Sequence, residues 1–176
     1  MSSQATTTPP TTTEPRQRTH TWDDPMATVR AAAGRTGLEI MQDVRDGVVP
    51  APPIARLIGF ELAKVEDGLA EFRLVPQDYM YNPIGSVHGG IYATLLDSAA
   101  GCAVHTTLPA GVGYTSQDLS VKFLRRITVE TGPVRCVGRV KHRGRSTALA
   151  EAELLDGQDR LLAYATSSCL ILGPNA

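Results

Sequence analysis

The sequence predicts an α+β domain in which an antiparallel sheet wraps around one long buried helix. Two features predict this fold class. An apolar run of small residues follows the glycine-rich turn at 81–90 and continues to about Thr107 without a polar face, which indicates a helix buried on all sides. A hairpin pattern precedes this run and four alternating segments follow it, which is the order expected when an antiparallel sheet packs on a single helix.

The composition indicates one globular domain with an N-terminal tail. The chain has 176 residues, of which 42% are apolar, and a formal net charge of −1. This charge gives no general attraction to nucleic acid or to a membrane surface, and the central apolar run is too short and too interrupted to span a bilayer. The three cysteines show no metal-ligand spacing and fit reduced thiols in a cytoplasmic protein. We therefore expect no metal, nucleic-acid or membrane partner.

The N-terminal part of the chain is expected to lie outside the main domain. Residues 1–24 are rich in Ser, Thr and Pro and have few apolar residues to bury, so we predict a disordered tail. We expect its removal up to residue 22 to leave activity intact. Residues 25–53 are predicted to contain a helix, which begins behind Asp24 and Pro25 and is interrupted by two glycines, and then a proline-rich connector.

Residues 54–173 are predicted to form the main domain. A short helical turn at 54–59 leads into a hairpin whose strands flank Asp67-Gly68, a dipeptide that favours a tight turn. After the central helix, glycine-rich or charged connectors separate four further strands. The predicted strands span residues 60–65, 69–76, 114–125, 133–142, 147–155 and 161–172.

One carboxylate, Asp97, lies within the apolar run of the central helix. An unpaired buried carboxylate costs several kcal/mol, so its presence indicates a chemical role. Gly89 and Gly90 fall where the first free N–H groups of the helix are expected, and such amides can stabilise a developing oxyanion. Asp97 follows Gly89 by eight residues, or about 12 Å along a helix axis. One helix cannot present both groups to one substrate, so we expect an active site shared across a two-fold dimer.

These residues resemble the motif of the hotdog-fold acyl-CoA thioesterases of the phenylacetate-degradation (PaaI-like) type. The pattern is N-x-x-G-x-x-H-G-G, which runs from Asn82 to Gly90, with an acid nine residues after His88. The similarity extends from about residue 54 to residue 171. It implies a hotdog fold, here with a helical N-terminal extension, and hydrolysis of an aromatic or medium-chain acyl-CoA to free acid and CoA. It also implies self-association as a homodimer or dimer of dimers, and no cofactor, because coenzyme A is part of the substrate.

The resemblance implies a role for each motif residue. Asp97 would activate a water molecule as a general base, or attack the thioester itself. Gly89, with Asn82 nearby, would polarise the thioester carbonyl from the other subunit. His88 would orient the Asn82 turn or contact the thioester.

Two further groups are candidates for the site. In the strand after the helix, Ser116 matches a position that holds the attacking water in some relatives, and Thr115 is the alternative if the register shifts by one residue. A basic turn at 141–146 is a candidate for the phosphates of coenzyme A, since a guanidinium group matches phosphate with two donors. The candidate substrate-binding residues besides Thr115 are Gly90, Arg143, Gly144, Arg145 and Ser146.

Purely structural roles and other functions remain open from the sequence. Asp97 could be satisfied by backbone or hydroxyl groups, His88 could cap the helix, and Asn82 could be a turn residue. A hotdog dehydratase or hydratase also uses a helix with an acid and a histidine, and a non-hydrolytic acyl-CoA sensor would bind without cleaving. Release of free thiol distinguishes the thioesterase from both.

Overall fold

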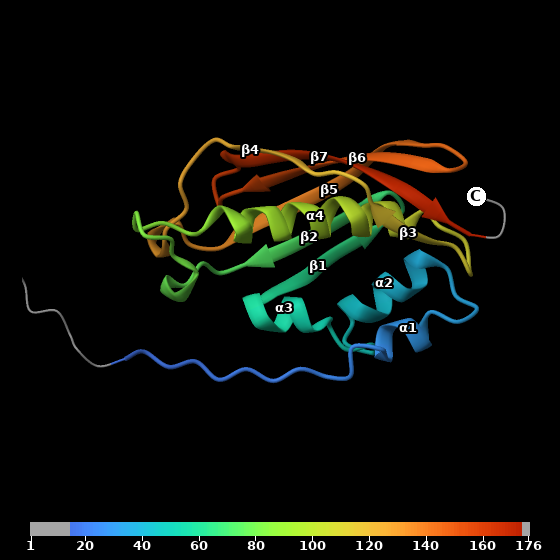
Figure 1. Cartoon of the computed structure of the whole chain (residues 1–176), viewed down its shortest axis with the longest axis horizontal. Coiled ribbons are helices and arrows are strands. Elements are labelled where there is room, and N and C mark those ends of the chain that lie inside the picture. Colours follow the sequence, from blue (N-terminus) through green and yellow to red (C-terminus); the bar gives the residue numbers. More distant parts are fainter. Residues whose placement is uncertain (1–14, 174–176) are drawn as a thin grey trace, which may run out of the picture.

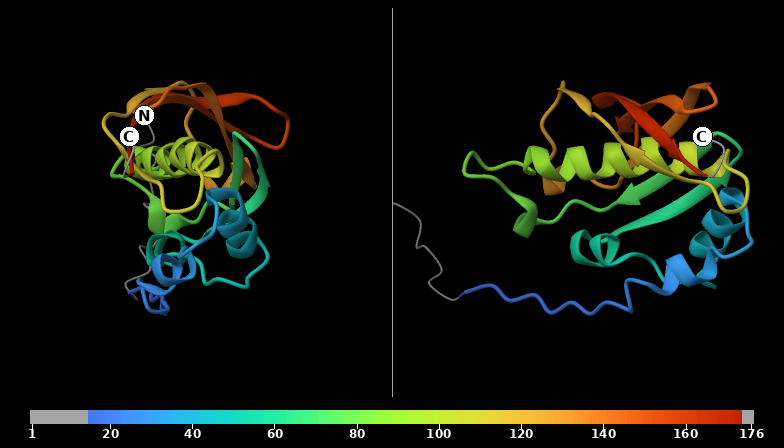
Figure 2. Two further views of the ribbon diagram at one scale, coloured as in Figure 1. Left: turned by 90° about the vertical axis from the view of Figure 1, so that its right-hand side faces the viewer. Right: turned by 45° about the vertical axis from the view of Figure 1, so that its right-hand side comes forward.

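The computed structural model describes residues 15–173 and confirms the predicted fold class. The strands are β1 (Phe60–Glu66), β2 (Leu69–Leu74), β3 (Gly113–Ser116), β4 (Ser120–Phe123), β5 (Val134–Arg143), β6 (Thr147–Leu155) and β7 (Leu161–Leu172). They form one antiparallel sheet in the order β1-β2-β5-β6-β7-β3, with β4 also paired to β7. The sheet arches over the central helix α4 (Gly89–Thr106), which lies in its concave side (Figures 1 and 2). The predicted disorder of residues 1–14 lies outside the described residues.

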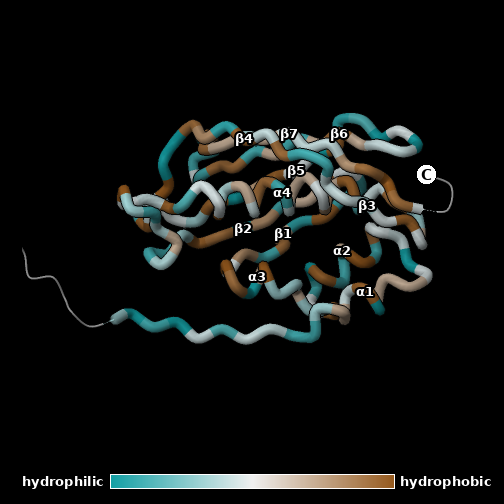
Figure 3. Tube along the Cα trace, viewed as in Figure 1, coloured by the Kyte–Doolittle hydropathy of each residue, from teal (hydrophilic) through white to brown (hydrophobic). Residues whose placement is uncertain are grey.

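Shorter helices lie before the sheet and in its connections. They are α1 (Ala27–Ala31), α2 (Gly37–Arg45), α3 (Pro53–Ile58) and two 3₁₀ turns, η1 (Asp78–Met80) and η2 (Val129–Thr131). Helices α2 and α3 carry hydrophobic stretches, whereas the segment before α1 is hydrophilic to neutral (Figure 3). Between residues 15 and 173, no helix combines the length and apolar character needed to cross a membrane.

The predicted N-terminal helix is present as two helices. The Asp24 carboxylate accepts a hydrogen bond from the Met26 amide at 2.9 Å just before α1, as expected of an acidic residue at a helix start. Helix α2 begins with a capping box, in which Thr36 and Glu39 satisfy each other's backbone amides. The Gly37 amide then donates to the Leu108 carbonyl at 3.0 Å, which joins α2 to the end of α4.

The strand predicted for residues 114–125 is wrong in one respect, because it is broken into β3 and β4. Ser116 pairs with Cys169 and Ser120 pairs with Thr166. Between these two pairs the chain advances by four residues in the β3–β4 segment but by only three residues in β7. The extra residue makes a β-bulge. Asp118 holds the bulge in place, since its carboxylate accepts the Ser168 amide at 3.0 Å.

Helix α4 is not buried on all sides, contrary to the sequence prediction. One face packs against the sheet and includes fully buried Leu95, Leu96 and Ala99. The opposite face is partly exposed in the single chain, because the sheet covers only part of the circumference of the helix. This uncovered face comprises Gly90, Ala93, Thr94, Asp97, Ser98, Cys102 and His105.

The sheet approaches α4 most closely at Gly138 in β5. A Cβ atom at this position would lie 2.0 Å from the carbonyl oxygen of Ala99. No real side chain tolerates that separation, so the contact between β5 and α4 requires glycine.

We predict that Gly138→Ala destabilises the fold by about 1–3 kcal/mol, because the methyl group forces the strand and the helix apart. The midpoint of urea unfolding measures this loss. Gly157→Ala is the matched control, since Gly157 has no positive φ and a Cβ there meets no atom within 4 Å. An unfolding midpoint equal to that of the wild type would contradict the close packing described here.

Candidate active site

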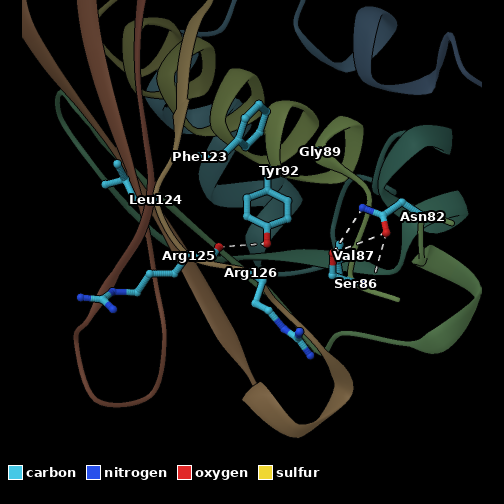
Figure 4. Close-up of a pocket in the computed structure, with 9 residues that line it drawn as sticks. All are labelled: Asn82, Ser86, Val87, Gly89, Tyr92, Phe123, Leu124, Arg125 and Arg126. Carbon is cyan, nitrogen blue, oxygen red and sulfur yellow. Dashed lines mark hydrogen bonds between the residues drawn. The ribbon is translucent and has the colours of Figure 1, made fainter. Parts of the chain in front are cut away.

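The turn that leads into α4 is organised by Asn82. Its side-chain oxygen accepts hydrogen bonds from the amides of Ile84 at 3.1 Å and Ser86 at 3.2 Å, and its Nδ2 donates to Ser86 Oγ at 3.2 Å. A bridge between Tyr81 and Val87 closes the base of the turn. Asn82 therefore fixes the path of the chain into the helix, and its side chain lies at the rim of a cavity (Figure 4).

His88 caps the helix and determines which amide remains free. Its Nδ1 accepts the Gly90 N–H at 2.9 Å, so this nitrogen carries no proton. Its own backbone amide donates to the Met80 carbonyl at 2.8 Å. Among residues 15–173, no acceptor takes the Gly89 N–H. At the positive end of the α4 dipole, Gly89 rather than Gly90 thus offers a hydrogen-bond donor to a ligand.

The free amide lies at a cavity of about 340 Å³. The Phe123 ring packs against Gly89, where a Cβ would lie 3.2 Å from the ring, and contacts the Tyr92 ring edge-on with centroids 5.6 Å apart. Burial raises the pKa of the Tyr92 phenol, which donates to the Arg125 carbonyl at 3.2 Å (Figure 4). The cavity is lined by Asn82, Ser86, Val87, Gly89, Tyr92, Phe123, Leu124, Arg125 and Arg126.

The two arginines of this cavity were not among the residues that the sequence predicted for the site. Arg125 and Arg126 are exposed, and no carboxylate among residues 15–173 forms an ion pair with either of them. The signal was present in the sequence as two adjacent cations at the end of the strand that follows the helix. The sequence alone does not assign these two arginines to the site, because the curvature of the sheet is what brings this end of the strand close to Gly89.

Asp97 lies two turns further along α4 and contacts a different strand. Ser116 Oγ, on β3, donates to Asp97 Oδ1 at 3.0 Å. Thr115 is the neighbouring residue and points to the other face of the strand, so of the two candidates Ser116 is the one that contacts Asp97. A second cavity of about 400 Å³ opens beside this pair, lined by Ala93, Thr94, Asp97, Ser116, Gln117, Asp118 and Leu119.

The structure therefore does not bring the predicted residues into one site within a single chain. The first cavity holds the Gly89 amide and Asn82, and the second holds Asp97 and Ser116. The residues of one cavity are absent from the other, and the eight-residue spacing on α4 separates Gly89 from Asp97 by about 12 Å.

The basic turn between β5 and β6 lies across β7 from β3, the strand that carries Ser116. The Ser146 carbonyl accepts the Ile171 amide at 2.9 Å, so the turn lies against β7. Leu170 of β7 pairs with Thr147 of β6 on one side and with Thr115 of β3 on the other. The start of β6, next to the turn, therefore lies two strand spacings, about 10 Å, from β3. Arg143, Gly144, Arg145 and Ser146 line neither cavity.

The half-buried residue Cys102 lies near Asp97, but its thiol is unsuited to be a nucleophile. Burial raises the pKa of Cys102 to about 12, and the Asp97 charge adds to this rise while a hydrogen bond with Tyr114 opposes it. Burial also raises the pKa of Cys136 and of Cys169. No three His, Cys, Asp or Glu side chains between residues 15 and 173 are grouped to hold a metal ion.

We predict that the three cysteines of the folded protein react slowly with a thiol reagent such as DTNB at pH 8. The thiolate is the reactive form, and the raised pKa of each thiol favours its protonated form. Denaturant should release all three for rapid labelling, which serves as the internal control. Rapid labelling of the native protein at pH 8 would show that these thiols are not buried as described.

Comparisons with known proteins agree with the fold and the motif. The model of the Thioesterase superfamily matches residues 84–163. The 1,4-dihydroxy-2-naphthoyl-CoA hydrolase of Listeria monocytogenes is 26% identical over 114 residues, which cover 65% of this chain and 89% of that protein.

Solved structures show the same relationship. A phenylacetic acid degradation-related protein of Ralstonia eutropha JMP134 is 30% identical, with a TM-score of 0.67 over 74% of this chain and 98% of that chain. The PaaI protein of the E. coli phenylacetic acid degradation operon shares the fold, with a TM-score of 0.68 over 78% of this chain and 97% of that chain at 19% identity. The chain therefore belongs to the thioesterase superfamily, as a hotdog-fold thioester hydrolase of the PaaI-like type.

Proposed function

We propose that the protein hydrolyses an aromatic or medium-chain acyl-CoA to the free acid and CoA in a site shared by two protomers. Asp97 of one protomer supplies the carboxylate, and Gly89 of the partner subunit supplies the amide that binds the thioester oxygen. The separation of these two groups into two cavities on one helix is the observation that carries this proposal.

A two-fold pairing of α4 helices would join the two half-sites. The uncovered face of α4 carries Asp97 in its middle and begins at Gly90, next to the free amide. If two such faces pack antiparallel with the two-fold axis near Ala93, midway between Gly89 and Asp97, each Asp97 lies beside the first turn of the partner helix. The pairing would also cover the face that the sheet leaves open, where small residues such as Gly90, Ala93 and Ser98 let two helices approach closely.

The reaction needs only these groups and a water molecule. The Gly89 amide stabilises negative charge on the carbonyl oxygen, a contribution of about 3 kcal/mol for one oxyanion donor. Asp97 removes a proton from the water that adds to the carbonyl carbon, or it adds to that carbon itself and water resolves the anhydride. When water adds first, the C–S bond of the resulting tetrahedral adduct breaks and the CoA thiolate takes up the proton from Asp97. When Asp97 adds first, the C–S bond breaks as the anhydride forms, and the water that later hydrolyses the anhydride supplies the proton to the thiolate. Ser116 holds Asp97 in position through the 3.0 Å hydrogen bond.

The acyl-CoA class is supported by the positions of the charged side chains. Arg125 and Arg126 lie at the cavity that holds the free amide, and Arg143 and Arg145 lie in the basic turn. Guanidinium groups bind phosphate with two donors, so both pairs suit the phosphates of coenzyme A. The name of the Listeria relative, a naphthoyl-CoA hydrolase, agrees with an aromatic acyl group.

We predict that Asp97→Ala lowers kcat by about 10²-fold or more, because it removes the base. Release of CoA thiol from benzoyl-, phenylacetyl- and medium-chain acyl-CoA measures the loss. Asp67→Asn, in the exposed turn between β1 and β2, is the matched control and should keep wild-type turnover. Wild-type turnover in Asp97→Ala would reject the assignment. Binding without thiol release by the wild type would favour an acyl-CoA sensor, and hydration without thiol release a hydratase.

The phosphate contacts can be tested separately. We predict that Arg143→Ala and Arg145→Ala each raise KM more than they lower kcat, because the phosphates are bound equally in the ground and transition states. Arg126→Ala is expected to behave in the same way, since this side chain extends from the other cavity. A large loss of kcat at unchanged KM would reject a phosphate-binding role for the variant that shows it.

A further inference from the structure

Residues 15–24, which we name the strap, lie in an extended path along the outer side of α3 (Figures 1 and 2). They form no helix or strand and their side chains are exposed. The strap is nevertheless connected to the domain through three charged residues, Arg16, Arg18 and Asp23. These contacts all converge on α3 and η1.

Arg18 binds the C-terminal end of α3. Its guanidinium group donates to the carbonyls of Leu57 at 2.5 Å and Arg56 at 3.3 Å. These carbonyls belong to the last turn of a helix, where they have no partner within the helix and where the dipole favours a cation. Gly59, in the left-handed conformation, caps α3 through its amide and the Ala55 carbonyl, and Arg18 supplies partners for two further carbonyls of the last turn.

The same guanidinium group also holds Tyr79, in the middle of η1. Its Cζ atom lies 4.1 Å from the centre of the Tyr79 ring, within the range of a cation–π contact. The Tyr79 hydroxyl donates to the Ile58 carbonyl at 2.8 Å, so it satisfies the remaining carbonyl at the end of α3. Arg18 and Tyr79 thus join the strap, α3 and η1 at one point.

Two ion pairs flank this point. Arg16 pairs with Asp78, the first residue of η1, and Asp23 pairs with Arg56 of α3 at 2.9 Å. Both pairs are exposed, so each contributes little alone. Their arrangement on either side of Arg18 fixes the direction in which the strap crosses α3.

The contacts continue from η1 to the free amide. The carbonyl of Met80, the last residue of η1, accepts the His88 amide at 2.8 Å. His88 in turn caps Gly90 and leaves the Gly89 N–H unpaired. A displacement of η1 would therefore move the residue that determines which amide is free.

We infer that the strap positions the Gly89 amide through η1 and His88, and that Arg18 is a positioning residue for the hydrolysis. This inference rests on the proposed function for its kinetic consequence and on the contacts of Arg18 for its physical basis. It replaces the expectation that the chain up to residue 22 is dispensable.

The strap carries its own probe, because Trp22 is the only tryptophan of the chain. Trp22 is 60% exposed and stacks on His20, so its fluorescence anisotropy reports whether the strap is held against the domain. In full-length Arg18→Ala we expect the anisotropy to fall toward that of a peptide of residues 15–24. We also expect kcat to fall about two- to fivefold, the equivalent of one lost cation–π contact.

Arg18→Lys keeps the positive charge but loses the planar guanidinium group with its several N–H donors, so it should recover only part of the Trp22 anisotropy and part of kcat. Arg45→Ala is the matched control, since Arg45 pairs with its neighbour Asp46 away from the strap. Unchanged anisotropy in Arg18→Ala would show that Arg18 does not hold the strap, and reduced anisotropy with wild-type kcat would show that the strap does not position the site. Either result overturns the inference. If the wild type releases no thiol, the proposed function fails instead, and the anisotropy still tests the docking of the strap.

Discussion

The rigidity of one helix is the constraint on which the rest of this structure depends. Helix α4 presents an unpaired amide at its first residue and a carboxylate two turns later, and no bend in an 18-residue helix packed against a sheet can bring the two together. The sheet encloses α4 on one side and leaves the side that carries Asp97 open. In the proposed function, a second copy of the chain covers the open face and supplies the missing group.

The details around α4 serve to keep its first turn in a defined state. Without a cap, several amides at the helix start would compete for a ligand or for water. His88 takes the Gly90 amide, and Asn82 fixes the turn that delivers the chain to the helix. The Phe123 ring packs directly against Gly89. The result is one free donor in a fixed position, which is the preorganisation that oxyanion stabilisation requires.

Much of this arrangement could be predicted from local sequence. The helix of small apolar residues, the hairpin at Asp67-Gly68 and the four later strands follow from periodicity and turn chemistry. The premise that singled out Asp97 was wrong in part, because this residue lies on the uncovered face of α4 and is only partly buried in the single chain. Features set by distant parts of the chain could not be predicted. The bulge at 117–119 depends on the pairing of Asp118 with β7, and this pairing decides between Ser116 and Thr115. The contacts of Arg18 join parts of the chain that are far apart in sequence, so the composition of the tail conceals them.

The shared site is tested most directly by mixing two inactive variants. Asp97→Asn removes the base. Gly89→Pro removes the N–H at the first helical position, and the extended backbone of His88 (φ −63°, ψ 138°) suits a residue that precedes proline. A Cβ at this position meets only the tip of the Phe123 ring, at 3.2 Å, so a small shift of that ring accommodates the proline. After subunit exchange, half of the dimers are hybrids with one intact site, so about a quarter of wild-type activity should return. If each site lay within one chain, the mixture would stay inactive, and that result would contradict the account.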